Sequence, residues 1–200
     1  ADVVFAAGTT GEWDRVPNAV SQRVVQVCTE EVAKANTRLA PGEGRPVEAW
    51  AGVTAHTAAD TLENLERAIH HGADAVVLAP LSIRGVSDPV HFVVRDVADL
   101  MDRCTRRVPL YPYDNADIAV DPKVPHIRTH QVKALSRLDF VRGIKVSARR
   151  KVLGDYIQAA ASFRDRGEFG IYVGNAMLIF HIFQPRSRWS GALLSRYQRW

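Results

Sequence analysis

The residue with the clearest chemical potential in this 200-residue sequence is Lys145. It follows the apolar run 140–144, which is typical of a buried strand, and the chain holds only five lysines against twenty-one arginines. Because apolar surroundings disfavour an ammonium, they lower the pKa of a lysine and free its amine to attack a carbonyl. Strand alternation places Lys145 on one face with Gly143 and Val141, whose small side chains would leave room for a ligand. The commoner alternative is a strand-end lysine whose head reaches solvent.

A tyrosine, Tyr113, ends the preceding apolar run, 108–113. Pro109 and Pro112 restrict ordinary ladder pairing within this run, which predicts an unusual or bulged strand. Beside an imine-forming lysine, the phenol of Tyr113 can pass protons to and from a substrate. The alternative is a packing tyrosine with its hydroxyl at the rim. Its same-face neighbour Tyr111 is expected to lie in the core.

The third set of reactive groups is the run 8–12, Gly-Thr-Thr-Gly-Glu, which follows the first apolar run. Its glycines permit a tight backbone, while hydroxyls and free N–H groups can hold a carboxylate or a phosphate. Turns of this kind are common after strands, so the motif is weak evidence when taken alone. The predicted strand ends carry none of the histidines, cysteines or paired carboxylates that a metal site or a thiol nucleophile requires. We therefore expect no metal.

These groups lie at the ends of short apolar runs that alternate with longer amphipathic segments. Near-continuous apolar runs are typical of strands covered on both faces, and their strict alternation with helices predicts a parallel α/β fold. In such folds, functional residues gather at the C-terminal ends of the strands. Neither a dinucleotide-binding glycine fingerprint nor a Walker loop is present. The predicted strands are 3–7, 47–53, 75–78, 108–113, 140–144 and 169–173, and the predicted helices are 18–39, 58–71, 89–103, 127–135 and 152–166.

Composition places the chain among ordinary globular proteins. With 46% hydrophobic and 24% charged residues, disorder, collagen and disulfide scaffolds are excluded. No apolar run approaches the roughly 20 residues that span a bilayer, and residues 1–7 lack the basic start of a signal peptide. We therefore expect no membrane partner. The two cysteines, Cys28 and Cys104, fit a reducing environment, which predicts a cytoplasmic protein.

The net charge of +4 is concentrated at the C-terminal end of the sequence. Residues 181–200 hold four arginines and no acidic residue, so residues 1–180 contain 22 basic and 22 acidic residues. A short basic tail on a neutral body does not favour nucleic-acid binding, and no nucleic-acid partner is expected. The sequence thus divides into one domain, 1–180, and a basic, aromatic tail, 181–200.

Read in order along the chain, the motifs resemble those of the dihydrodipicolinate synthase/N-acetylneuraminate lyase family. The resemblance is carried by the Gly-Thr-Thr-Gly-Glu run after an early strand, Tyr113 at the end of a middle strand, and Gly143-Ile144-Lys145 at the end of the next. Members are lysine-dependent class I aldolases and lyases on a (β/α)8 TIM barrel. The similarity covers about residues 1–180, and the runs 51–53 (Ala-Gly-Val) and 72–76 (Gly-Ala-Asp-Ala-Val) support it.

This resemblance implies an activity and a role for each candidate residue. Lys145 would form a Schiff base with a pyruvate-type 2-oxo acid, and Tyr113 would be the proton-transferring phenol. Thr9 and Thr10 would bind the substrate carboxylate, one of them also relaying protons to the tyrosine. A protonated imine stabilises a carbanion at the next carbon as an enamine, so neither a metal nor an organic cofactor is implied.

The sequence also departs from the family at several positions. Leu81 and Ser82 stand where the synthase branch has an aromatic pair, one of which is lent to a neighbouring subunit. The family's Y-N-x-P is replaced by the run 113–116, Tyr-Asp-Asn-Ala, and Ile118 stands near the place of the arginine that binds the second substrate. Dihydrodipicolinate synthesis is therefore not expected. Cleavage or dehydration of another 2-oxo acid, or a related condensation, fits better.

The largest departure is length. The Gly-Thr-Thr-Gly-Glu loop normally follows the second barrel strand, yet here it begins at residue 8, and no eighth-strand pattern follows Gly174. We therefore expect a barrel that lacks its first and eighth strands, with two exposed edges. Such a chain should be weakly stable, feebly active and prone to form homo-oligomers. The alternative is a non-catalytic barrel remnant that acts through self-association or partner binding along these edges.

Overall fold

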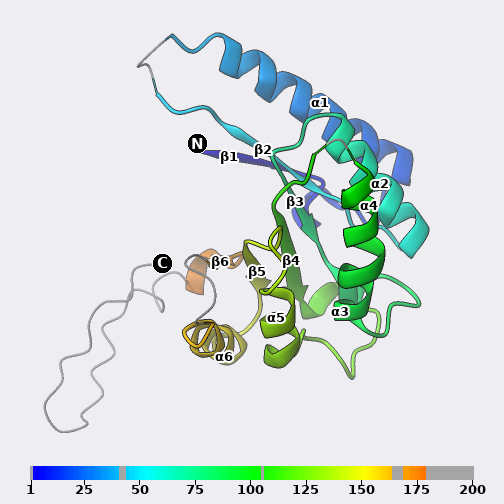
Figure 1. The fold of residues 1–200 in the computed structure, drawn as a ribbon, viewed down its shortest axis with the longest axis vertical. Coiled ribbons are helices and arrows are strands. Elements are labelled where there is room, and N and C mark those ends of the chain that lie inside the picture. The colour runs from blue at the N-terminus through cyan, green and yellow to red at the C-terminus, as the bar shows by residue number, and fades with distance from the viewer. Residues whose placement is uncertain (1, 41–43, 105, 164–168, 179–200) are drawn as a thin grey trace, which may run out of the picture.

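Six strands form a single parallel sheet in the computed structural model, which describes residues 2–40, 44–104, 106–163 and 169–178 (Figure 1). Each strand pairs in parallel with its neighbours in sequence, in the order β1-β2-β3-β4-β5-β6. This arrangement confirms the predicted α/β fold. The strands are β1 Val3–Ala6, β2 Glu48–Gly52, β3 Ala75–Leu78, β4 Leu110–Asn115, β5 Gly143–Ser147 and β6 Gly170–Val173.

Helices connect the strands and lie around the outside of the curved sheet (Figure 1). Two sequence features make α2 a helix. The Thr57 side chain caps its start by accepting a hydrogen bond from the Asp60 amide at 3.1 Å. Leu65, Ala68 and Ile69 form its buried face.

The predicted helix 89–103 contains a π-helical stretch, Val93–Val97. No described helix is both long and apolar enough to cross a bilayer. The helices are α1 Asn18–Thr37, α2 Ala58–His70, α3 Pro89–Phe92, α4 Ala98–Arg103, α5 Thr129–Leu135 and α6 Arg150–Ala160, with 3-10 turns at Thr9–Gly11, Pro80–Ser82, Ala116–Ile118 and Ala176–Leu178.

The sheet separates an outer apolar core from a smaller inner one. Alternate residues of each strand point outward against the helices, as Ile144 and Val146 do. On the concave inner face, Trp50 of β2 stacks on Tyr111 of β4 at 4.4 Å between ring centroids and meets Tyr172 of β6 at 5.3 Å. Strands β2 and β6 therefore touch through their side chains although three strands separate them. The six strands form a half-barrel, a partial (β/α)8 architecture.

Two strands extend further than their apolar runs predicted. Strand β4 continues to Asn115 and β5 to Ser147, so Tyr113 and Lys145 lie inside their strands rather than at the ends. Strand pairing uses backbone groups, so it continues past the apolar run, and the added residues Asn115 and Ser147 line a polar cavity. The predicted helix 152–166 begins earlier, at Arg150, and ends at Ala160. The tail expected at 181–200 lies outside the described residues.

An irregularity lies at the junction of β4 and β5, in the segment before Lys145 and not in the proline-containing strand where the sequence predicts it. Leu110 pairs with Val141 and Tyr113 pairs with Lys145, so two residues on β4 lie opposite three in the segment before Lys145. An extra residue of this kind is a β-bulge, which reverses the side-chain alternation beyond it. Val141 accordingly packs in the outer core, and the expectation that it shares a face with Lys145 is wrong.

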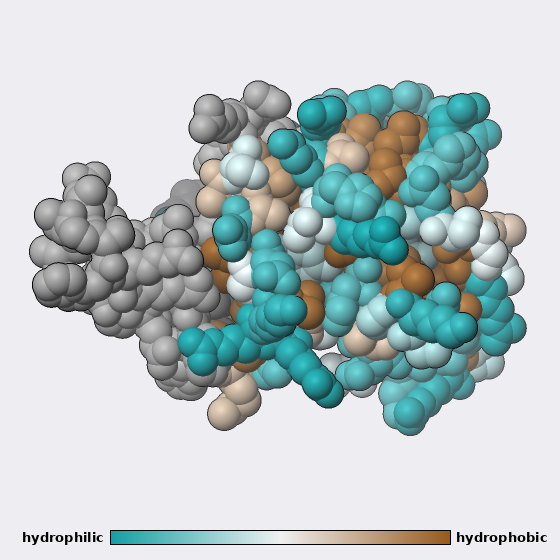
Figure 2. All heavy atoms as spheres, turned by 90° about the horizontal axis from the view of Figure 1, so that it is seen from below, coloured by the Kyte–Doolittle hydropathy of each residue, from teal (hydrophilic) through white to brown (hydrophobic). Residues whose placement is uncertain are grey.

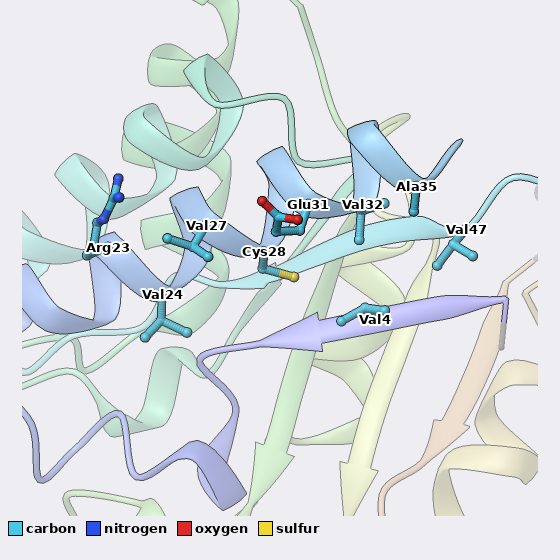
Figure 3. A pocket seen from close by; sticks show the side chains of 9 residues that line it. All are labelled: Val4, Arg23, Val24, Val27, Cys28, Glu31, Val32, Ala35 and Val47. Atoms are coloured by element: carbon cyan, nitrogen blue, oxygen red, sulfur yellow. The ribbon is translucent and has the colours of Figure 1, made fainter. Parts of the chain in front are cut away.

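An apolar groove of about 640 Å³ runs between α1 and the edge strand β1. Figure 3 shows Cys28 and Val32 of α1 directed toward Val4 of β1, with Val24 further along the same side of the helix. Val4, Val24 and Val27 are 41%, 47% and 39% exposed, although the surface in Figure 2 is mainly hydrophilic with scattered hydrophobic patches. An apolar surface beside an unpaired strand edge promotes association.

We predict that the chain self-associates through this groove, and that charge placed in it weakens the association. The double variant Val24→Glu/Val27→Glu should lower the association constant by at least about tenfold, because a contact would have to bury two carboxylates. Sedimentation velocity over a range of concentrations measures the effect. Val120→Glu, at a 52% exposed valine outside the groove, is the matched control. A wild-type chain that stays monomeric would contradict the prediction.

Candidate active site

The amine of Lys145 lies between two aromatic rings on the inner face of the sheet. Its Nζ is 4.0 Å from the ring centroid of Tyr113 on β4 and 4.3 Å from that of Phe5 on β1. Burial lowers the pKa of the Lys145 ammonium below its ordinary value, and the interaction with Tyr113 acts in the opposite direction. The lysine is therefore half-buried against aromatic faces, and the solvent-directed alternative does not describe it.

The hydroxyl of Tyr113 is the centre of a hydrogen-bond network. It accepts hydrogen bonds from Thr9 Oγ1 at 3.3 Å and from Asn115 Nδ2 at 3.1 Å, and donates one to Ser147 Oγ at 3.0 Å. These partners come from three different βα segments of the fold. Tyr113 is buried, so the network fixes both its ring and the direction of its proton.

A cavity of about 860 Å³ opens beside this network. Of the residues predicted for the site, Thr9, Thr10 and Tyr113 line it, whereas the Lys145 amine lies between the Phe5 and Tyr113 rings and is not among its described lining residues. Thr9 and Thr10 lie in a 3-10 turn. The Thr9 hydroxyl donates a hydrogen bond to the Tyr113 hydroxyl, whereas Thr10 is exposed. The structure thus brings Thr9, Tyr113 and Lys145 together, with Thr10 at the rim.

Two glycines make room for this arrangement. A Cβ at Gly8 would lie 2.6 Å from the Phe5 ring, which contacts Lys145. A Cβ at Gly174 would collide with the hydroxyl of Ser147, which accepts the proton of Tyr113. The missing side chain of Gly8 therefore leaves space for the Phe5 ring, and that of Gly174 leaves space for the Ser147 hydroxyl.

Gly143 has a different role from the predicted one. The sequence predicts that its small size leaves room for a ligand next to Lys145. Instead, a Cβ at Gly143 would collide with the backbone carbonyl of Gly170, its partner on β6. The glycine of the Gly-Ile-Lys run thus allows close approach of β5 and β6.

Several site residues were not predicted from the sequence. Asn115 and Ser147 lie two residues after Tyr113 and Lys145, so strand alternation could have identified them had the strands been extended. The sequence predicts a strand at Phe5 but no role for it in the site. His126 lines the cavity and its Nδ1 lies 2.8 Å from Asp114 Oδ2, a pairing that no spacing rule indicates. Among the described residues, no group of three or more histidine, cysteine or acidic side chains could hold a metal.

Structure comparison finds this fold in solved proteins of one family. A prophage protein of the dihydrodipicolinic acid synthase family from E. coli K12, in complex with pyruvate, matches with 17% identity and a TM-score of 0.70 over 90% of this chain and 54% of that chain. Dihydrodipicolinate synthase from Bacteroides thetaiotaomicron matches with 16% identity and a TM-score of 0.70 over 92% and 55%. KD(P)GA from T. tenax matches with 18% identity and a TM-score of 0.63 over 92% and 54%.

The chain therefore spans about half the length of the solved structures it matches. No protein-family model matches it, and no curated protein matches at the sequence level. The resemblance to the dihydrodipicolinate synthase family predicted from the motifs is confirmed, and at these identities it establishes the shared fold, a partial (β/α)8 barrel.

We predict that Gly143→Ala destabilises the protein by about 1–3 kcal/mol, because the added methyl group forces β5 away from β6. Thermal or urea unfolding followed by circular dichroism measures the change. Gly11→Ala is the matched control: no atom lies within 4 Å of the added Cβ, and its effect should stay within about 0.5 kcal/mol. Equal stability of Gly143→Ala and the wild type would contradict the packing described at this position.

Proposed function

We propose that this chain carries the site of a class I lyase or aldolase, which acts on a pyruvate-type 2-oxo acid through a Schiff base at Lys145. The observation that carries the proposal is the setting of the Lys145 amine between Phe5 and Tyr113. Burial lowers the pKa of this lysine, so a larger fraction of it is the free amine near neutral pH. Only the free amine attacks a carbonyl carbon.

The network around Tyr113 supports proton transfer at the imine carbon. Hydrogen bonds donated by Thr9 and Asn115 stabilise negative charge on the phenol oxygen, and Ser147 Oγ accepts the hydrogen bond that the phenol donates. The amine lies over the ring of the same tyrosine, so the phenol is the nearest proton-transfer group described for the addition of the amine and the loss of water. The flexible stem of Lys145 lets its head move from the rings into the cavity.

The substrate carboxylate fits the turn that contains Thr9 and Thr10. Both residues line the cavity, and they supply two hydroxyl groups at the rim nearest Tyr113. Carboxylates are bound by hydroxyl and backbone N–H donors in turns of this kind. With these donors, the 2-oxo acid places its carbonyl carbon toward the amine, and no organic cofactor or metal is needed in the proposed reaction.

The inner apolar cluster argues against dihydrodipicolinate synthesis. Ile118 packs against this cluster, at the place where the synthase branch has a substrate-binding arginine, and Ser82 is 4% exposed. We propose cleavage or dehydration of another 2-oxo acid instead.

The two free cysteines, Cys28 and Cys104, agree with a cytoplasmic setting. Residues 1–180 remain our proposal for the catalytic domain, and a homo-oligomer for its assembly.

The experiment that tests the function is reductive trapping. We expect borohydride with pyruvate to add a pyruvate-derived mass to the peptide that contains Lys145, because borohydride reduces an imine to a stable amine. The adduct should disappear in Lys145→Ala and persist in Lys133→Ala, a matched change on the exposed face of α5. Intact-protein and peptide mass spectrometry measure the labelling.

Labelling of Lys123, Lys133 or Lys151 in place of Lys145 would contradict the assignment. No label with pyruvate or any other 2-oxo acid of a panel would refute the Schiff-base function. It would favour the non-catalytic alternative, for which the apolar groove beside β1 is the supporting observation.

A further inference from the structure

Helix α1 carries a second apolar face that its own sheet does not cover. The buried face of the helix consists of Ser21, Val25, Thr29 and Val32. Val20, Val24 and Val27 lie on a different face and are exposed. Their spacing of four and then three residues is that of a seam between two packed helices. Valine is a weaker helix former than the long polar residues usual at exposed positions, so this face favours a contact with a second helix.

The same side of the helix carries two opposite charges, placed symmetrically about Val27. Arg23 lies four residues before Val27 and Glu31 lies four residues after it, and all three line the apolar groove between α1 and β1 (Figure 3). Arg23 has no ion-pair partner among the described residues. Glu31 contacts Lys34 of the same helix at 2.7 Å through Oε1, on the exposed surface. A positive charge on one side of a centre and a negative charge on the other make this face complementary to its own copy turned end for end.

The orientation of two copies decides whether these charges attract. When the α1 helices run antiparallel and cross at Val27, Arg23 faces Glu31 of the partner subunit and Glu31 faces Arg23 of the partner subunit. The contact then holds two ion pairs around an apolar centre. With parallel helices, Arg23 would face Arg23 of the partner subunit, and like charges repel. The charges therefore favour a two-fold axis at Val27.

The free edge of β1 fits the same two-fold axis. Strand β1 pairs with β2 on one side, and no described strand lies on its other side. Its backbone can pair with β1 of a second copy, and a two-fold axis perpendicular to the sheet makes that pairing antiparallel. Helix α1 contacts both β1 and β2. Since paired strands lie about 4.8 Å apart, two helices that each lie over such a strand pair come to about 10 Å from one another, close to the spacing of about 8–10 Å between packed helices.

We propose that this chain forms a symmetric dimer in which β1 pairs with β1 and α1 packs on α1 of a second copy, both antiparallel, about a two-fold axis at Val27. The dimer covers the exposed valines Val4, Val24 and Val27 and joins two six-stranded sheets into one. The inference goes beyond the proposed function, and it does not depend on a Schiff base at Lys145.

The test is an exchange of charges in the full 200-residue chain. Arg23→Glu and Glu31→Arg each place like charges opposite one another at two symmetric positions, whereas the double variant Arg23→Glu/Glu31→Arg restores opposite charges in exchanged places. The dissociation constant of the dimer is measured by sedimentation equilibrium at low ionic strength, where charges are least screened. Glu66→Arg, at an exposed position of α2, is the matched control for Glu31→Arg. Circular dichroism checks that each variant is folded.

We expect the wild type to dimerise and each single reversal to raise the dissociation constant by about tenfold or more, because two attractive contacts become repulsive. The double variant should return to within about threefold of the wild type, and Glu66→Arg should stay within about twofold. Glu31→Arg and the double variant both lose the pair between Glu31 and Lys34 within α1. Recovery in the double variant therefore isolates the contact between copies.

A cross-linking experiment determines the direction of the helices. In a background of Cys28→Ser and Cys104→Ser, Val27→Cys should form a disulfide-linked dimer under copper-catalysed oxidation by air, because position 27 lies at the axis. Val20→Cys should not, because it lies seven residues, about 10 Å, from the axis and about 20 Å from its counterpart. A disulfide needs Cα atoms within about 7 Å of one another. Non-reducing gel electrophoresis measures both variants.

Four results would overturn the inference. Equal cross-linking at positions 20 and 27 would indicate parallel helices, and a dimer that is not cross-linked at position 27 would place the axis elsewhere. A double variant as weak as the single reversals would show that the charges do not meet. A wild type that stays monomeric at every concentration would show that something else covers this face, such as a further βα unit. None of these results bears on trapping at Lys145, so the proposed function is tested separately.

Discussion

Removal of a lysine amine from water is the constraint on which the rest of the site depends. An ammonium between two aromatic faces loses hydration, and cation–π contacts with Phe5 and Tyr113 replace only part of it. Three features produce this setting. Gly8 leaves space for the Phe5 ring, the bulge before β5 directs Lys145 inward, and hydrogen bonds to the phenol hold the Tyr113 ring. The chemistry proposed for the lysine follows from the packing around it.

The curvature of the sheet is what brings these groups together. Phe5 belongs to β1 and Lys145 to β5, so their contact requires that strands four places apart in the sheet face each other. The rings of Trp50, Tyr111 and Tyr172 fill the concave side below them and join β2, β4 and β6. The same half-barrel leaves an apolar groove at the β1 edge. The proposed site and the apolar groove are therefore features of one curved sheet.

The sequence predicted the parallel strands and the helices, because near-continuous apolar runs and helical patterns report burial directly. The motifs at the strand ends predicted Thr9, Tyr113 and Lys145, which lie together in the structure. The sequence did not predict the structural features that depend on the pairing register of the strands. The bulge moved Val141 to the outer core, and the strands run past their apolar segments to Asn115 and Ser147. The pairing of His126 with Asp114 arises from a loop that returns to its own strand. Loop closure of this kind leaves no periodic signal, so only the structure shows it.

The protonation equilibrium of Lys145 tests the central claim most directly. In a chain whose five lysines carry ¹³C at Cε, each lysine titrates as a separate NMR signal, and Lys145→Ala identifies the signal of interest. We predict that Lys145 loses its proton at clearly lower pH than Lys34. Lys34 is the internal reference, because its hydrogen bond to Glu31 raises its pKa. If Lys145 instead titrates together with Lys34, its amine is not desolvated by the two rings, and the account of this site is wrong.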